Sequence, residues 1–175
     1  MASNHQPIDT YPWAKILPRW ILGIVEVGLS IYIVINFHQV LGLVFCAAWI
    51  LALFVMLPLL RCTKCYYYGK RCNTAWGLIT KFMFPPGDQV YFQSAYGLTF
   101  IFWPLRIIPL GLGALTLLGD FKFNPQGLFL IYVGAMILHR LYYRAANCPV
   151  CRQKAVCPVY NPHILAPQMS DPNAT

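Results

Sequence analysis

The feature that most constrains this chain is the run from Val40 to Leu60, 21 consecutive residues without a charged side chain. A helix of about 20 apolar residues, rising 1.5 Å per residue, is long enough to cross the hydrocarbon core of a bilayer. The chain as a whole is 58% hydrophobic and only 10% charged, whereas a soluble domain carries roughly 25% charged residues. Too few charges are present to cover a soluble surface of this size. The sequence therefore predicts an integral membrane protein.

Three further apolar stretches are long enough, or nearly so, to cross a membrane. They are Ile16–Phe37, a segment within Ala95–Leu118, and Gly127 to about Tyr143. The last stretch is short, so we expect its final turn to reach into the headgroup region. The sequence therefore predicts an all-α membrane protein with four transmembrane helices, arranged as two hairpins.

Basic residues are distributed unevenly around these stretches. They precede the first predicted span and follow the second and the fourth, at Lys15, Arg19, Arg61, Lys64, Lys70, Arg71, Lys81, Arg140, Arg144, Arg152 and Lys154. Only Lys122 lies in a loop at the other side. Cytosolic loops carry the excess of Lys and Arg, so both termini are predicted to be cytosolic, in a plasma or inner membrane. The net charge of +8 is explained by this topology, and a nucleic-acid partner is not expected.

Six of the seven cysteines form two sets with nearly the same spacing. The first set follows the pattern Cys-x2-Cys-x6-Cys and the second Cys-x2-Cys-x5-Cys; they are Cys62, Cys65, Cys72 and Cys148, Cys151, Cys157. A Cys-x2-Cys pair directs two sulfurs inward from one tight turn, as a tetrahedral metal site requires. Cytosolic thiols stay reduced, so a disulfide framework is disfavoured. The pattern predicts a metal site, with zinc as the expected metal and an iron–sulfur cluster as the alternative.

Several ligand sets remain open for this metal. One zinc could be bound by the two Cys-x2-Cys pairs, or two zinc ions could share all six thiolates. His163 could instead complete a Cys3His site with the second set. Thiol-based redox chemistry or metal transfer is a further interpretation of the same residues. Cys46 lies alone within the uncharged run and is expected to be an inert apolar side chain.

The two halves of the chain resemble each other at an offset of 86 residues. Pro18 corresponds to Pro104 (104 − 18 = 86), and the two Cys-x2-Cys pairs correspond at the same offset (148 − 62 and 151 − 65). Such a parallel repeat places a pseudo-twofold axis along the membrane normal. That axis would bring the two cysteine sets together at one surface.

The chain is accordingly divided into five parts. They are a cytosolic N-terminal segment (1–15), the first transmembrane hairpin (16–60), a cysteine cluster with an interfacial helix (61–91), the second transmembrane hairpin (92–146), and the second cysteine cluster with an extended tail (147–175). The interfacial helix is expected within Asn73–Phe84, where Trp76, Ile79, Phe82 and Met83 recur at helical spacing.

Two ionisable side chains lie inside predicted spans. Glu26 is about ten residues into the first span, and Arg106 is in the third. An isolated charge there costs on the order of 3 kcal/mol on insertion. Because each residue would remove the other's penalty, the sequence predicts a Glu26–Arg106 ion pair, with a proton relay through Glu26 as a further interpretation. His139, near the end of the fourth span, is expected to lie at the membrane interface.

The sequence contains no nucleophile–base pair, phosphate-binding glycine loop or carboxylate dyad that stands out. We therefore expect a small metal-binding membrane subunit without catalytic activity of its own, acting as a scaffold or anchor in a larger membrane complex. The aromatic side chains that follow the first Cys-x2-Cys pair, from Tyr66 to Phe84, suit contacts with partner subunits or lipid headgroups. The alternatives are an iron–sulfur electron-transfer subunit and a thiol-based metal or redox carrier.

Overall fold

The computed structural model describes residues 6–97, 102–118, 126–157 and 159–160. Every regular element in these ranges is helical, and the only β-type pairing among them is an isolated parallel bridge between Ile8 and Cys151. The all-α class predicted from the sequence is confirmed. The predicted His163 ligand and the tail beyond residue 160 lie outside the described residues.

The first hairpin consists of α1 (Trp13–Phe37) and α2 (Gln39–Leu51). Two π-helical turns, Ala52–Met56 and Pro58–Cys62, continue α2 without a break in direction. His38 makes the reversal between the helices in an extended conformation (φ −158°). Gly42 sits where a Cβ atom would lie 2.2 Å from Ile35 Cγ1, so only glycine lets the two helices approach this closely.

A short helical region separates the hairpins. It contains α3 (Trp76–Met83), a 3₁₀ turn (Gln89–Tyr91) and α4 (Phe92–Gly97). The sequence placed the third predicted span within Ala95–Leu118, but α5 begins only at Pro104. Proline suits the first turn of a helix because backbone N–H groups in that turn have no acceptor within the helix, so a residue without an N–H loses no hydrogen bond there. The second hairpin is then formed by α5 (Pro104–Leu118) and α6 (Gln126–Tyr142), and a π-helical turn (Tyr143–Asn147) extends α6.

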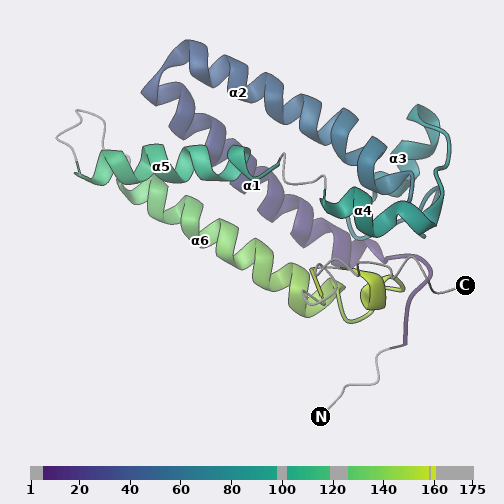
Figure 1. The fold of residues 1–175 in the computed structure, drawn as a ribbon. Coiled ribbons are helices and arrows are strands. Elements are labelled where there is room, and N and C mark those ends of the chain that lie inside the picture. Colours follow the sequence, from purple (N-terminus) through teal and green to yellow (C-terminus); the bar gives the residue numbers. More distant parts are fainter. Residues whose placement is uncertain (1–5, 98–101, 119–125, 158, 161–175) are drawn as a thin grey trace, which may run out of the picture.

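The two hairpins run in the same direction (Figure 1). α1 lies at the centre of the bundle and contacts α2, α5 and α6. One end of the bundle holds the reversal between α1 and α2, the C-terminal end of α5 and the N-terminal end of α6. The other end holds α3 and both cysteine sets. Within the second hairpin, Gly113 lets α5 approach Phe129, because a Cβ there would lie 2.1 Å from the Phe129 ring.

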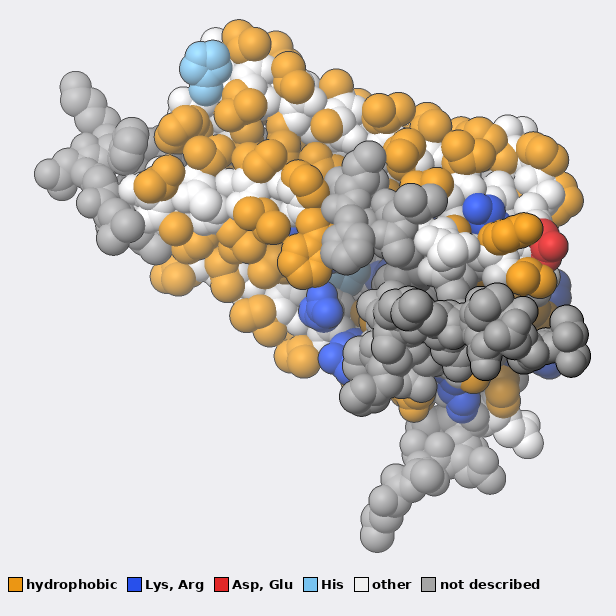
Figure 2. All heavy atoms as spheres, in the orientation of Figure 1, with side chains coloured by type: hydrophobic (Ala, Val, Ile, Leu, Met, Phe, Trp, Pro, Cys, Tyr) orange, Lys and Arg blue, Asp and Glu red, His pale blue; other side chains and the backbone are white. Residues whose placement is uncertain are grey.

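Apolar side chains fill the inside of the bundle as well as covering its outside, and a few polar side chains are buried among them. Glu26 and Ser30 of α1 are 2% and 0% exposed. Large apolar side chains cover the outside of α1, α2, α5 and α6, as Figure 2 shows for one face. Two helical segments, Trp13–Phe37 and Gln39–Cys62, are long and apolar enough to cross a membrane. α5 and α6, with 15 and 17 residues, are shorter.

Both hairpins end in the same backbone pattern. A π-helical turn closes through Thr63 N–H to Pro58 O (3.0 Å) in the first and through Cys148 N–H to Tyr143 O (3.1 Å) in the second. Cys62 is the last residue of the first turn, and Cys148 is the residue directly after the second. In both pairs the second cysteine donates its N–H to the carbonyl oxygen of the first, at 3.3 and 3.2 Å. The segments that resemble each other in sequence therefore contain the same kinds of turn, shifted by one residue relative to the cysteines.

Candidate functional site

The first cysteine set is packed into an apolar cluster at one end of the bundle. Cys62 and Cys72 are buried there with Tyr67 and Trp76, and Cys65 packs against them. The cluster forms because α3 turns back onto the end of the α2 extension. Ala75 makes that turn with a left-handed backbone (φ 59°).

Polar contacts already engage two thiols of this set. Cys72 Sγ accepts the backbone N–H of Gly77 at 3.4 Å and lies 3.2 Å from Thr74 Oγ1. Cys65 Sγ donates to Gln153 Oε1 at 2.8 Å, across to the second cysteine segment. These contacts hold the sulfurs of Cys65 and Cys72 in place.

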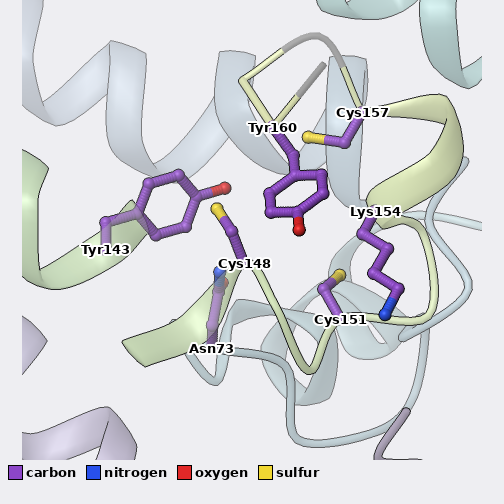
Figure 3. Close-up of a pocket in the computed structure, with 7 residues that line it drawn as sticks. All are labelled: Asn73, Tyr143, Cys148, Cys151, Lys154, Cys157 and Tyr160. Carbon is purple, nitrogen blue, oxygen red and sulfur yellow. The ribbon is translucent and has the colours of Figure 1, made fainter. Parts of the chain in front are cut away.

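The second set surrounds a small cavity instead (Figure 3). Cys148, Cys151 and Cys157 line it, and their sulfurs face the same space beside the Tyr160 ring. The other lining residues are Asn73, Tyr143 and Lys154. The cavity has a volume of about 10 Å³, which is the space of roughly one water molecule.

The two sets lie against each other. Cys151 packs against the apolar cluster that holds the first set, and it also lines the cavity of the second. Tyr67 joins the two segments, because its hydroxyl accepts the backbone N–H of Arg152 at 3.1 Å. All six cysteines of the predicted site are therefore found at one end of the bundle, as a parallel repeat requires.

The N-terminal segment lies between the two cysteine segments. Ile8 donates its N–H to Val150 O (3.0 Å) and accepts the Tyr67 hydroxyl at its carbonyl oxygen (2.7 Å). Tyr11 donates its N–H to Arg71 O (2.9 Å) and its hydroxyl to Asn147 O (2.8 Å). No role for these residues was predicted from the sequence. Two of these contacts join backbone groups and two join a tyrosine hydroxyl to a backbone oxygen, all with residues more than fifty positions away, for which a single sequence carries no signal.

Burial favours the protonated form of three thiols at this end. It raises the pKa of Cys148 to about 11 and also raises the pKa values of Cys65 and Cys151. In both Cys-x2-Cys pairs a backbone N–H two residues further on, from Tyr67 or Gln153, acts in the opposite direction on the second cysteine. Metal binding here would have to displace the thiol protons. Amide donors directed at sulfur would favour the thiolate.

Within the described part of the chain, no three His, Cys, Asp or Glu side chains are arranged closely enough to hold a metal ion. Binding by the second set would require its sulfurs to turn towards one point in the cavity. The zinc and iron–sulfur assignments therefore stay predictions.

The aromatic residues that follow the first Cys-x2-Cys pair are largely used inside the protein. Tyr67 and Trp76 are 2% and 7% exposed. The Tyr66 hydroxyl donates to Asp9 Oδ1 at 2.7 Å, and the Tyr68 hydroxyl donates to Phe84 O at 2.8 Å. Phe82, in contrast, is 81% exposed. Trp76 therefore packs into the apolar cluster while Phe82 of the same helix is exposed, and the interfacial position of α3 stays a prediction.

A second group of functional side chains lies within the bundle, around Glu26. Arg106 Nε is 2.9 Å from Glu26 Oε1, so the two residues that were expected to pair are in contact. His139 Nδ1 is 2.6 Å from Glu26 Oε2, and its side chain is 15% exposed. This contact was not predicted from the sequence, and the placement of His139 at a membrane interface stays a prediction. Its spacing along α6 could not reveal this contact, which depends on how α6 is rotated against α1.

Comparison of the chain with protein-family models, with curated proteins and with solved structures found no match.

Proposed function

We propose that this chain is an integral membrane protein that crosses the bilayer four times and carries a zinc-binding, cysteine-rich end on the cytosolic side. In this proposal it has no catalytic activity, and its cysteine-rich end serves as a scaffold or anchor for other membrane subunits. One observation supports the proposal above all others. Both cysteine segments lie at the same end of an apolar bundle and are in contact through Cys65 and Gln153.

The apolar exterior supports the membrane assignment. Leu43 and Val44 of α2 are 68% and 61% exposed, and Leu130 of α6 is 64% exposed. Exposed apolar area on this scale is unfavourable in water but stable against lipid. α6 with its π-helical extension has 22 residues (17 + 5), or about 33 Å, enough to span. α5 reaches about 22 Å, which a locally thinner bilayer can accommodate.

The distribution of basic residues supports the cytosolic assignment. The visible Lys and Arg side chains gather towards the end that holds α3 and α4 (Figure 2). Arg71, Arg152 and Lys154 come from the cysteine segments themselves. Cytosolic sides of membrane proteins carry this excess. The same cations would offset the negative charge of thiolates around a metal ion.

The repeated backbone pattern supports the metal assignment. Each Cys-x2-Cys pair begins at the end of a π-helical turn, and each has an amide donor near its second sulfur. Such turns are the usual source of two ligands for zinc. In the second set all three cysteines line one small cavity, together with the Tyr160 ring. In the reducing cytosol, metal binding explains two such sets better than disulfides do.

Two measurements on the full chain test this function. The first is labelling of the thiols in sealed, oriented vesicles with a membrane-impermeant maleimide. We expect both cysteine sets to react from one side only, and reaction of the two sets from opposite sides would contradict the four-span topology. In the Cys46→Ser variant the labelling should be unchanged, because Cys46 lies in the middle of α2.

The second measurement is elemental analysis after anaerobic purification. Zinc bound in at least one equivalent per chain, and lost when both cysteine sets are changed to serine, supports the proposed function. Iron with acid-labile sulfide and a visible absorbance bleached by reductant would replace it with an electron-transfer function. The metal assignment would be overturned if the purified chain bound no metal in a buffer that contains competing thiols at their cytosolic concentration.

A further inference from the structure

Glu26 is the centre of a buried polar group that joins the two hairpins. It lies near the middle of α1 and is 2% exposed. Oε1 contacts Arg106 of α5 at 2.9 Å, and Oε2 contacts His139 of α6 at 2.6 Å. One carboxylate thus connects α1 of the first hairpin to both helices of the second.

The distance to His139 fixes one proton in this group. A nitrogen and an oxygen approach to 2.6 Å only with a proton between them, and such short contacts are typical of charge-assisted hydrogen bonds. With a neutral imidazole, Nδ1–H donates to the carboxylate and Nε2 keeps the lone pair that can accept a proton. The charges of Arg106 and Glu26 then cancel. Uptake of one proton at Nε2 changes the net charge of the group from 0 to +1.

The other ionisable groups near this site come from α1, α2 and α6. Tyr132 of α6 donates its hydroxyl to Arg106 O at 3.3 Å, and the segment Gln39–Leu51 of α2 contains only the thiol of Cys46. The imidazole lies over α1 at Gly23, where a Cβ would be 3.7 Å from His139 Cε1. One helical turn further along both helices, the Arg19 guanidinium lies 4.1 Å over the Tyr143 ring. Among the described residues, the ionisable side chains in contact with Glu26 are Arg106 and His139.

We infer that Glu26 and His139 form a proton-binding site inside the bundle, and that Arg106 couples its occupancy to the contact between the hairpins. A bilayer interior makes any uncompensated charge costly. With His139 protonated, two cations share one carboxylate, so the net attraction between Glu26 and Arg106 is weakened. A weaker Glu26–Arg106 contact loosens a tie between α5 and α1. This inference rests on the proposed membrane location and does not depend on the metal site.

Nuclear magnetic resonance of the full chain in lipid nanodiscs, with ¹⁵N-labelled histidine, tests the proton site. We expect one imidazole with a strongly hydrogen-bonded Nδ1 proton and with an Nε2 resonance that shifts reversibly on acidification. This set of resonances should be lost in His139→Gln and kept in His38→Gln, a matched control at the α1–α2 turn. In Glu26→Gln the signature of the charge-assisted hydrogen bond should disappear, since a neutral amide replaces the carboxylate.

Hydrogen exchange of α5 tests the coupling to Arg106. After correction for the intrinsic effect of pH, acidification should reduce the protection of α5 amides in the wild type and leave it unchanged in His139→Gln. Circular dichroism establishes that each variant remains helical. The inference is overturned if the resonances assigned to His139 do not change over the whole pH range in which the protein stays folded. It is equally overturned if they are insensitive to Glu26→Gln.

Discussion

The two cysteine segments have the same backbone turns but different surroundings. In the first, the thiols are packed against Tyr67 and Trp76, and two of them make polar contacts. In the second, three sulfurs face a cavity of about 10 Å³. Beyond the first set, α3 folds back and fills the space beside the sulfurs. Within the second set, a 3₁₀ turn, Lys154–Val156, leads to Cys157.

Cysteine can therefore play two different roles in the two segments. A buried, hydrogen-bonded thiol acts as a small apolar side chain and stabilises packing. A thiol that faces space and shares it with other thiols can bind a ligand. Cys148 and Cys157 are also buried, and tyrosine hydroxyls contact Cys148 and Cys151. The second set is distinguished by the cavity that its three cysteines line together, and we propose it as the better candidate for metal binding on that ground.

The largest expected effect concerns metal content. Changing Cys148 and Cys151 to serine should lower zinc affinity by at least about 100-fold, because two direct ligands are lost and even outer-shell changes cost 10- to 100-fold. The matched change of Cys62 and Cys65 should lower affinity less, since the Cys65 thiol is already bonded to Gln153. Competition with a fluorescent zinc chelator measures both. Equal losses in the two variants would show that the two cysteine sets act as one centre, and would contradict the proposed difference between them.

A second prediction concerns the packing of α3 over the first set. A Cβ at Gly77 would lie 2.1 Å from Tyr67 O and 2.6 Å from Lys70 O. Both neighbours are backbone atoms and cannot rotate away, so Gly77→Ala should destabilise the fold by about 3 kcal/mol, the upper range for overpacking. Thermal unfolding in detergent measures the loss. Gly28→Ala is the control, because nothing lies within 4 Å of its Cβ position.

A third prediction concerns the bond that joins the two cysteine segments. Tyr67→Phe removes a hydroxyl that donates to Ile8 O and accepts from Arg152 N–H. It leaves a carbonyl and an amide without this partner, so a loss of about 1–2 kcal/mol is expected. Tyr66→Phe should cost less, because its hydroxyl bonds to the exposed Asp9. Similar losses in the two variants would mean that Tyr67 does not hold the segments together.

The smallest expected effect concerns pH and the N-terminal segment. The hydrogen bond from Tyr66 holds the pKa of Asp9 below its ordinary range, and the charge of Arg152, 2.7 Å away, acts in the same direction. The ionised form is thus favoured in the folded state. Its stabilising contribution is full above the ordinary aspartate pKa and is lost as the pH falls through the lowered value. Limited proteolysis near residue 9 should therefore become faster at acidic pH. The rate in Asp9→Asn should be insensitive to pH over the same range.

Much of the secondary structure could be predicted from composition and spacing. The predicted span Ile16–Phe37 corresponds to α1, and Gly127–Tyr143 corresponds to α6 within a few residues. Apolar runs of this length satisfy their backbone hydrogen bonds within a helix, so a local signal is sufficient. The boundary of α5 was not predictable in this way, because the apolar run before Pro104 does not show where the helix begins.

The sequence by itself determined the helical, apolar character of the chain, the two sets of cysteines and the need of Glu26 for a partner. These properties follow from the kinds of residues present and their spacing along the chain, which fix what a helix can expose and what it must pair. Only the tertiary structure decided that His139 shares Glu26 with Arg106, that Ile8 and Tyr11 lie between the cysteine segments, and that one set is packed while the other faces a cavity. Such contacts depend on the rotation and tilt of helices that are distant in sequence, and one residue of rotation would turn each side chain about 100° away from its partner.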